Sequence, residues 1–192
     1  MPRAGLNTDQ VVAAGAALAD EIGFSALSLA GLADRLGVRP PALYKHVDSL
    51  ADLHRRIATL AMTELADEFR DALQGQAGAD ALAALFTTLR HYVERHPGRY
   101  SATIGARFDG ADDPLFVAGL RVINSIRAVL SGYGINPDDL DHAIRSLRCT
   151  VHGFAALQSA DGFQWSNDPD ESFTWMITFA DAGLRAIGAQ RS

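Results

Sequence analysis

The segment from Arg39 to Val47, RPPALYKHV, carries the side chains whose chemistry is easiest to interpret in this 192-residue chain. Arg39 can fork onto a guanine edge or reach a phosphate, and Lys45 can take a base edge or a phosphate. Ala42 is small enough to pack on a thymine methyl group. The segment contains no acidic residue. Its residue types therefore suit contact with the major groove of DNA.

Two short helices joined by a tight turn must position these side chains. Ser28 is a good N-cap residue. The apolar face of the first helix has the spacing i, i+3, i+4 and i+7, in Leu29, Leu32, Ala33 and Leu36. Gly37 can adopt the positive φ that ends a helix, and a second helix is expected from about Pro41. Leu43 and Val47, four residues apart, would face inward. This pattern is typical of a helix-turn-helix.

The chain from about residue 7 to residue 56 resembles the TetR family of bacterial transcriptional regulators. The resemblance rests on the Ser28-capped helix, on Gly37-Val38 and on the run from Leu43 to Val47. It implies that Tyr44 and His46 hold the sugar-phosphate backbone and that Ser28 offers its hydroxyl and a helix N-terminus to a phosphate. The candidate DNA-contacting residues are Ser28, Arg39, Pro41, Ala42, Leu43, Tyr44, Lys45 and His46.

One position departs from the family's pattern. TetR-like sequences often have a lysine just after the recognition helix, where it touches a DNA phosphate. The corresponding position in this chain is Leu50. The resemblance therefore does not supply that contact in this chain.

The charge of the chain is unevenly distributed. The first 56 residues hold six basic and six acidic side chains, so the rest of the chain carries the whole net charge of −6. Between Ser25 and Arg56 basic residues outnumber acidic ones by five to three. Positive charge close to the motif is what meets phosphate, and an acidic remainder discourages indiscriminate coating of DNA. The composition also fits a solvated hairpin whose basic residues only aid solubility.

The overall composition indicates an ordered, mostly helical globule. Hydrophobic residues make up 48% of the chain, and there are 17 glycines and 7 prolines. No apolar run approaches the length that crosses a bilayer, and no signal peptide pattern is present. Cys149 is the single cysteine, so it cannot form an internal disulfide. We expect a cytoplasmic protein without a membrane partner.

Capping signals and apolar periodicity predict helices throughout and no strand. Residues 1–48 would form a three-helix domain, and the capping sequence Ser49-Leu50-Ala51-Asp52 would open a long helix to about Leu73. Residues 49–192 would form a helical effector-binding and dimerisation domain. The expected fold class is all-α: a three-helix helix-turn-helix domain joined by a long helix to a helical ligand-binding and dimerisation domain. A short helix is expected over about 98–108. A nearly all-round apolar helix over about 114–130 would be buried on every side.

A single helix-turn-helix contacts too few base pairs for useful specificity, so a dimer is expected. Residues 136–187 resemble, less specifically, the C-terminal domain of one TetR subgroup, through Val151-His152-Gly153-Phe154 and Ala160-Asp161-Gly162-Phe163. The last two long helices would form a four-helix bundle with their symmetry mates, unless the monomer core uses them both. The candidate interface residues are Leu147, Val151, Phe154, Phe173, Trp175, Met176 and Phe179.

The middle helices hold polar residues in apolar surroundings, which suits a cavity for a small, uncharged or anionic amphipathic effector. For any one of these residues, an ion pair or hydrogen bond inside the core is the more common explanation. The candidate effector-pocket residues are Phe86, Arg90, Tyr100, Arg107, Phe116, Asn124, Arg127, Arg148 and His152. Binding would favour a state in which the long helix after Ser49 swings and releases the operator.

Metal and catalytic chemistry find little support. Asp138 and His142 are four residues apart on a helix, but capping already explains Asp138. No glycine-rich phosphate loop, serine elbow or pair of carboxylates stands out. We expect no cofactor, no metal and no enzymatic activity. The sequence therefore predicts a dimeric, ligand-responsive TetR-like regulator, a repressor, with a palindromic DNA operator and a small-molecule effector as partners. The competing prediction is a helical ligand-binding or catalytic protein that uses the helix-turn-helix only as scaffold.

Overall fold

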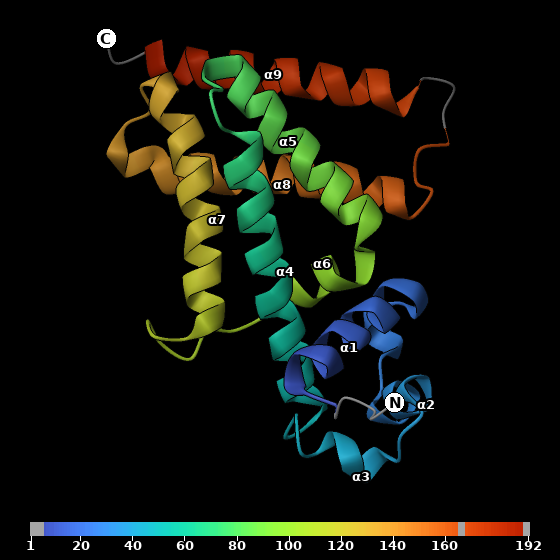
Figure 1. The fold of residues 1–192 in the computed structure, drawn as a ribbon. Coiled ribbons are helices and arrows are strands. Elements are labelled where there is room, and N and C mark those ends of the chain that lie inside the picture. Colours follow the sequence, from blue (N-terminus) through green and yellow to red (C-terminus); the bar gives the residue numbers. More distant parts are fainter. Residues whose placement is uncertain (1–5, 165–167, 190–192) are drawn as a thin grey trace. The chain divides into compact units, whose positions relative to one another are not determined.

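The computed structural model describes residues 6–164 and 168–189, and these residues contain helices and no strand (Figure 1). The helix-turn-helix region comprises α1 (Thr8–Ile22), the 3₁₀ turn η1 (Phe24–Ala26), α2 (Leu29–Leu36) and α3 (Pro40–Leu43). It is followed by α4 (Leu50–Ala72), α5 (Gly78–Arg95), α6 (Pro97–Thr103), α7 (Pro114–Leu130), η2 (Ser131–Tyr133), η3 (Pro137–Asp139), α8 (Leu140–Ser159) and α9 (Pro169–Ala189). The all-α fold class is confirmed.

The first helices begin where the capping residues predict. The Asn7 side chain accepts a hydrogen bond from the Gln10 amide at 2.8 Å, and the Gln10 side chain accepts one from the Asn7 amide at 3.0 Å. The Ser49 hydroxyl accepts from the Asp52 amide at 3.1 Å, while the Asp52 carboxylate accepts from the amide of Asp48 at 3.0 Å. Each cap satisfies amide groups that a helix N-terminus leaves without a partner.

The chain divides into two compact units. The first unit runs to Glu64 and also includes Arg95–Gly119, and the second comprises Leu65–Glu94 and the chain from Leu120 onward. This division differs from the predicted boundary after residue 48. The physical reason is packing: the first half of α4, all of α6 and the start of α7 contribute to the same unit as the helix-turn-helix.

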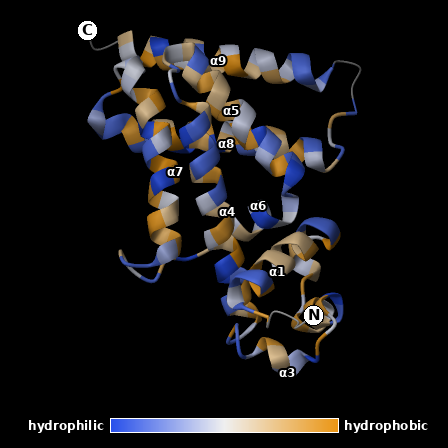
Figure 2. Cartoon of the chain, in the orientation of Figure 1, coloured by the Kyte–Doolittle hydropathy of each residue, from blue (hydrophilic) through white to orange (hydrophobic). Residues whose placement is uncertain are grey.

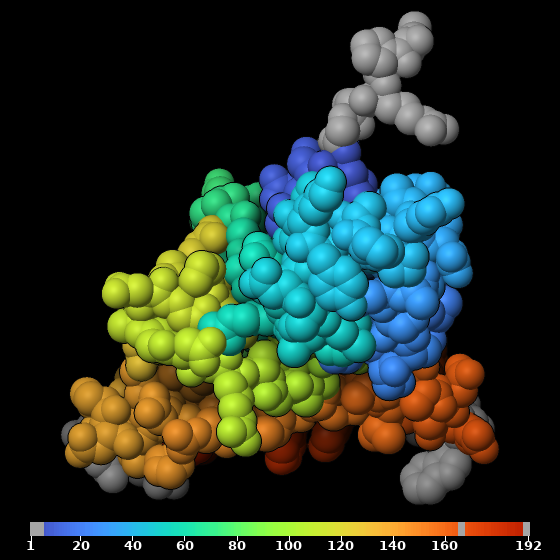
Figure 3. Space-filling view, turned by 90° about the horizontal axis from the view of Figure 1, so that it is seen from below, coloured from blue at the N-terminus to red at the C-terminus, as the bar shows by residue number. Residues whose placement is uncertain are grey.

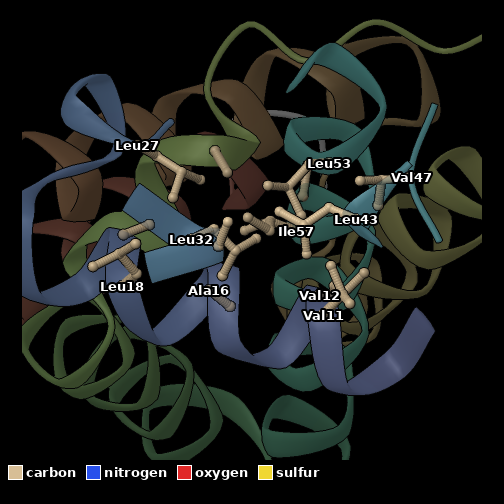
Figure 4. Close-up of a cluster of buried hydrophobic side chains, with 14 of the residues drawn as sticks. Val11, Val12, Ala16, Leu18, Leu27, Leu32, Leu43, Val47, Leu53 and Ile57 are labelled. Atoms are coloured by element: carbon tan, nitrogen blue, oxygen red, sulfur yellow. The ribbon is translucent and has the colours of Figure 1, made fainter. Parts of the chain in front are cut away.

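The core of the first unit joins α1, α2, α3 and the start of α4 (Figure 4). Its fully buried side chains include Val11, Leu32, Leu43, Leu53 and Ile57. Ala102 of α6 and Leu115 of α7 belong to the same cluster. Burying a leucine-sized side chain stabilises a fold by roughly 1.5–3 kcal/mol, so this shared core holds the helix-turn-helix and α6 together.

α6 is fastened to α1 at its N-terminal end. The Asp20 carboxylate of α1 accepts a hydrogen bond from the Arg99 amide at 2.8 Å, and so caps α6 from a neighbouring helix. The Arg99 guanidinium lies 3.0 Å from the Asp20 carboxylate and donates to Glu64 of α4 at 3.0 Å. At Gly98 the backbones of the two helices meet so closely that an added Cβ would overlap the carbonyl group of Ala19.

A second set of contacts holds the loop between α6 and α7. Arg55 of α4 donates to the carboxylate of Asp113 at 2.6 Å and to the carbonyl oxygen of Arg107 at 2.9 Å. Asp113 is buried. Hydrogen bonds from the backbone amides of Asp109 and Leu115, together with Arg55, hold the pKa of Asp113 below its ordinary value. The loop between α6 and α7 is therefore fixed against the start of α4.

In the second unit, Arg90 of α5 ties together the two last helices. Its guanidinium donates to Gln158 of α8 at 2.8 Å and to Asp170 of α9 at 2.5 Å. It also lies over the rings of Phe173, at 4.7 Å from the centroid, and Phe154, at 5.5 Å. Arg90 thus joins α5 to α8 and α9 through both its hydrogen bonds and its cation–π contacts.

α7 differs from its predicted character. Val117 and Leu120 are exposed, as are Asn124 and Arg127, so burial on every side is wrong. Figure 2 shows hydrophilic as well as hydrophobic residues along this helix. Pro114–Tyr133 nevertheless has the length and the mean hydropathy, 1.4, of a segment that can cross a membrane. Of the 18-residue stretch that has this hydropathy, 39% is buried inside the protein. A core helix of a water-soluble domain passes the same test.

Candidate nucleic-acid interface

The turn between α2 and α3 has the backbone geometry that a helix-turn-helix needs. Gly37 ends α2 in the left-handed conformation, with φ 66° and ψ 31°. The Gly37 amide donates to the carbonyl of Asp34 at 3.1 Å, and the Val38 amide donates to that of Ala33 at 3.0 Å. These bonds satisfy the last carbonyls of α2. The chain then enters α3 at Pro40, one residue earlier than predicted.

The recognition segment, Arg39 to Val47, is anchored by two apolar side chains. Leu43 and Val47 are buried in the core of the first unit, with exposed fractions of 0% and 1%. The inward orientation predicted for this pair is confirmed. The placement of Leu43 among the DNA-contacting residues is wrong, because a side chain without exposed surface cannot touch a duplex. Leu43 holds the segment in place instead.

The remaining side chains of the segment face away from the core. Tyr44 is 56% exposed, and Arg39, Pro41 and Lys45 are exposed. Ala42 and His46 are half-buried. Figure 1 shows α3 at the outer edge of the helix-turn-helix, beyond α1. The structure thus presents a short ridge with two cations and an aromatic ring.

Arg39 and Lys45 differ from the neighbouring cations because they have no ion-pair or hydrogen-bond partner among the described residues. By contrast, Arg35 forms a two-point ion pair with Glu21 at 2.6 and 2.7 Å, and Arg56 pairs with Asp52 at 3.0 Å. Arg55 is held by Asp113, as described above. Of the five basic residues between Ser25 and Arg56, the recognition segment therefore holds the two that remain available for phosphates or bases.

Two further positions flank the segment. The Ser28 hydroxyl accepts a hydrogen bond from the Gly31 amide at 3.1 Å, which confirms its role as N-cap of α2. Ser28 is exposed, so its hydroxyl remains accessible at this helix end. Leu50 is half-buried and packs against the core of the first unit. At this position the chain makes an apolar contact within its own unit.

Comparison with known proteins agrees with this geometry. Residues 11–57 match the family model described as bacterial regulatory proteins of the tetR family, and residues 82–180 match the model of the tetracyclin repressor-like C-terminal domain. The chain is 32% identical over 180 residues to the uncharacterized HTH-type transcriptional regulator Rv0681 of Mycobacterium tuberculosis, with 93% of this chain and 82% of the relative covered. The chain belongs to the TetR family of transcriptional regulators.

Other relatives of this TetR-family regulator are more distant. YobS of Bacillus subtilis, also an uncharacterized HTH-type transcriptional regulator, is 29% identical to this chain over 185 residues. The alignment covers 95% of each chain. A TetR variant from Acinetobacter baumannii, solved in complex with minocycline, has a TM-score of 0.70 and 24% identity, with 95% of this chain and 98% of that chain covered. ActR from Streptomyces coelicolor has a TM-score of 0.72 and 21% identity, with 98% of this chain and 99% of that chain covered. These two structures show the same fold, and the family is one of regulators rather than enzymes.

The predicted effector residues do not form one site. Tyr100, Arg107 and Phe116 belong to the first unit, whereas the others belong to the second. Phe86 and Arg90 are buried, and Arg90 is occupied by Gln158 and Asp170. His152 is half-buried. The remaining polar members are exposed: Arg107, Asn124, Arg127 and Arg148.

The predicted dimer residues fall into two groups. Trp175 and Phe179 of α9 are 66% and 65% exposed, their rings stack at 5.4 Å between centroids, and Met176 beside them is half-buried. Four of the predicted residues are instead buried against the chain's own helices and expose at most 9% of their surface: Leu147, Val151, Phe154 and Phe173.

Several positioning residues had no signal in the sequence. The partners of these hydrogen bonds are far apart in the sequence. Glu21 and Arg35 are 14 residues apart, and Arg55 and Asp113 are 58 residues apart. Asp20 and the Arg99 amide are separated by 79 residues. Each is a charged residue on a helix surface, where a solvated side chain is the ordinary expectation. Only the packing of separate segments within the first unit brings these partners together.

Proposed function

We propose that this TetR-family regulator is a repressor that binds a palindromic operator as a homodimer and is released by a small-molecule effector. TetR-family regulators bind DNA operators, act as dimers and bind small-molecule effectors. The observation that supports DNA binding most directly is the recognition segment itself. It exposes Arg39, Tyr44 and Lys45 on a short ridge whose two cations have no partner among the described residues.

A titration of operator DNA tests this role. The probe is the DNA upstream of the protein's own gene, in a gel-shift series from 50 to 200 mM salt. Removing a cation that touches a phosphate weakens binding and lowers the salt slope by roughly 0.9, while removing a cation that reads a base costs about 1–3 kcal/mol of discrimination. Arg39→Ala and Lys45→Ala are each expected to produce one of these effects.

Arg70→Ala is the matched control, because Arg70 is an exposed arginine of α4 in the second unit, paired with Asp67 and Asp71. It should leave operator affinity and salt slope unchanged. If Arg39→Ala and Lys45→Ala both behave like Arg70→Ala, the recognition segment is not the DNA-contacting element.

The stacked pair Trp175–Phe179 supports the proposed dimer. Large aromatic side chains that are two-thirds exposed in one copy are unusual on a protein that works alone, and aromatic residues are enriched at the centres of subunit interfaces. We therefore place the dimer contact on the outer face of α9. Its partner is a second copy related by a twofold axis, as a palindromic operator requires.

Light scattering measures this association. The wild-type chain is expected to have a dimeric mass at micromolar concentration, and Trp175→Ser with Phe179→Ser is expected to have a monomeric mass with unchanged helicity. The exposed Phe108 of the first unit provides the control variant, Phe108→Ser. A monomeric wild type, or a variant pair that remains dimeric, would contradict this placement.

The effector and the site of action complete the proposal. A ligand releases DNA only when it has different affinities for the DNA-bound and free conformations of the regulator. We infer that the protein acts in the cytoplasm, where the bacterial chromosome lies. An effector that binds without changing operator affinity would contradict the proposed response.

A further inference from the structure

The first unit contains an open hollow of about 500 Å³, beside the helix-turn-helix. Four parts of the chain line it: η1, the first two turns of α4, the segment from the end of α6 to residue 107, and the start of α7. All four belong to the first unit. In Figure 3 the cyan atoms around α3 and the start of α4 lie next to the yellow-green atoms of the loop between α6 and α7. This volume lies within the range of small-molecule sites.

Much of the hollow's wall is apolar. Phe24, Ala102, Ile104 and Leu115 contribute to it. Leu115 and Ala102 are buried in the core of the unit, so this part of the wall is rigid. Ile104 is 51% exposed, although Ala102 and Thr103, just before it, are buried. Contact with the apolar body of a ligand would remove this side chain from water.

The charged residues around the hollow leave one cation unpaired. The Arg55 guanidinium is held by Asp113 at 2.6 Å and by Asp109 at 2.8 Å. Asp52 is neutralised by Arg56 at 3.0 Å. The Arg107 guanidinium has no partner among the described residues, while its backbone carbonyl is fixed by Arg55. Arg55 with its two carboxylates carries a net charge of −1, so the named charges sum to zero together with Arg107, whose guanidinium is the cation left without an acceptor among the described residues.

His54 completes the wall without adding charge. Burial lowers the pKa of its imidazole, so the ring is neutral at pH 7. The ring lies 4.4 Å from that of Phe24, between centroids. Its buried Nε2 atom has no hydrogen-bond partner among the described residues. Because this atom is buried, it adds no exposed polar surface to the wall of the hollow.

We propose that this hollow binds a small amphipathic monoanion, an aromatic or short aliphatic carboxylate, with its acid on Arg107 and its apolar body against Phe24, Ile104 and Leu115. A cation would meet the unpaired Arg107, and a fully apolar compound would leave that guanidinium without an acceptor. This hollow would be the binding site of the proposed effector. Binding itself does not depend on the proposed function, whereas an effect of the ligand on transcription does. The ligand would lie within the unit that carries the recognition segment.

Calorimetry on the full chain tests the site directly. The probes are 2-naphthoate and its uncharged amide, which share one apolar body and differ in the acid. The naphthoate is expected to bind at one site per chain, and the amide about tenfold more weakly, the loss produced by one charge-assisted hydrogen bond. Chemical-shift changes in the amides of Ala51, Ala102 and Gly105 should accompany binding.

Three variants locate the bound acid. Arg107→Gln should weaken the naphthoate about tenfold and leave the amide unchanged. Ile104→Glu places an acid beside the apolar wall and should weaken both probes at least tenfold. Arg70→Gln removes an exposed arginine of the second unit and should change neither affinity. Arg107 and Ile104 are exposed, so both variants are expected to fold, which circular dichroism checks.

The outcome is independent of operator binding, because the calorimetric titration contains no DNA. Absence of naphthoate binding to the wild type, equal affinity for naphthoate and amide, or undiminished binding to Arg107→Gln would each overturn the inference. A loss of operator binding in Arg39→Ala with normal naphthoate binding would leave it standing. The two proposals therefore fail separately.

Discussion

Gly98 offers a stringent test of how closely α6 is fastened to α1. A Cβ at this position would overlap the carbonyl group of Ala19 and lie 2.5 Å from the amide nitrogen of Asp20, whereas real Cβ atoms essentially never come within 3.0 Å. Both obstacles are backbone atoms of α1, and the Ala19 carbonyl is nearer than the Asp20 nitrogen, so α6 must move away by more than the ~0.5 Å by which 2.5 Å falls short of 3.0 Å. That movement stretches the hydrogen bond from the Arg99 amide to Asp20, now 2.8 Å long.

The expected free-energy change follows from two opposing effects. Overpacking costs about 1–3 kcal/mol, and replacing glycine by alanine in a helix returns about 0.5–1 kcal/mol. The obstacles are backbone atoms that cannot turn aside, so the overpacking cost lies in the upper part of its range, and Gly98→Ala is expected to lower the free energy of unfolding by about 1–2 kcal/mol. For a chain of this size, such a change lowers Tm by about 2–8 °C.

Thermal unfolding followed by circular dichroism measures the effect, with Gly153→Ala as the matched control. Gly153 lies inside α8, and an added Cβ there would meet nothing within 4 Å. The control should raise Tm by about 1–4 °C, because alanine favours a helix over glycine by about 0.5–1 kcal/mol. If Gly98→Ala leaves Tm unchanged or raises it as Gly153→Ala does, the close contact between α6 and α1 is not present in solution.

Three further substitutions have definite expected outcomes. Leu43→Ala opens a cavity under the recognition segment and should lower the free energy of unfolding by about 2–5 kcal/mol, measured by urea denaturation; a loss below 1 kcal/mol would contradict its burial. Leu50→Lys supplies the cation that the family often has there and should steepen the salt dependence of operator binding by roughly 0.9, whereas an unchanged slope in gel shifts would argue against a phosphate at this position. Hydrogen bonds from Arg35 hold the pKa of Glu21 below its ordinary value. The ion pair therefore stabilises the fold fully at a pH above the ordinary pKa of a glutamate, and this stabilisation is lost as the pH falls through the lowered pKa of Glu21. Glu21→Gln should therefore lower Tm at pH 7 and have a smaller effect at acid pH, and an equal effect at both would refute the link.

The sequence predicts this fold where the signals are local. Asn7 with Gln10 and Gly37 define helix ends through hydrogen bonds within a few residues, and the structure contains these bonds. The outward ridge of the recognition segment follows from the same spacing, because Leu43 and Val47 must share one inward face. Periodicity could not show that α7 has exposed apolar residues, since Val117 and Leu120 carry the same side chains as buried positions.

Sequence pattern is weakest where distant segments meet. The short helix predicted over 98–108 ends at Thr103, because Ile104 is extended and Gly105 has a φ of 76°. Nothing near Asp113 indicates that its partner is Arg55, 58 positions away. The polar residues expected in one cavity are divided between two units for the same reason: helical periodicity gives the face of a helix but not its neighbour.

The assignment of Ala102 and Leu115 to the core around the helix-turn-helix affects how this regulator can be recombined with others. An N-terminal fragment ending near residue 56 would leave the apolar side chains beneath those two residues open to water. It would also lose Asp113 as the counterion of Arg55. A transplantable DNA-binding module must therefore be assembled from two stretches of the gene, with the 95–119 segment supplied alongside the first.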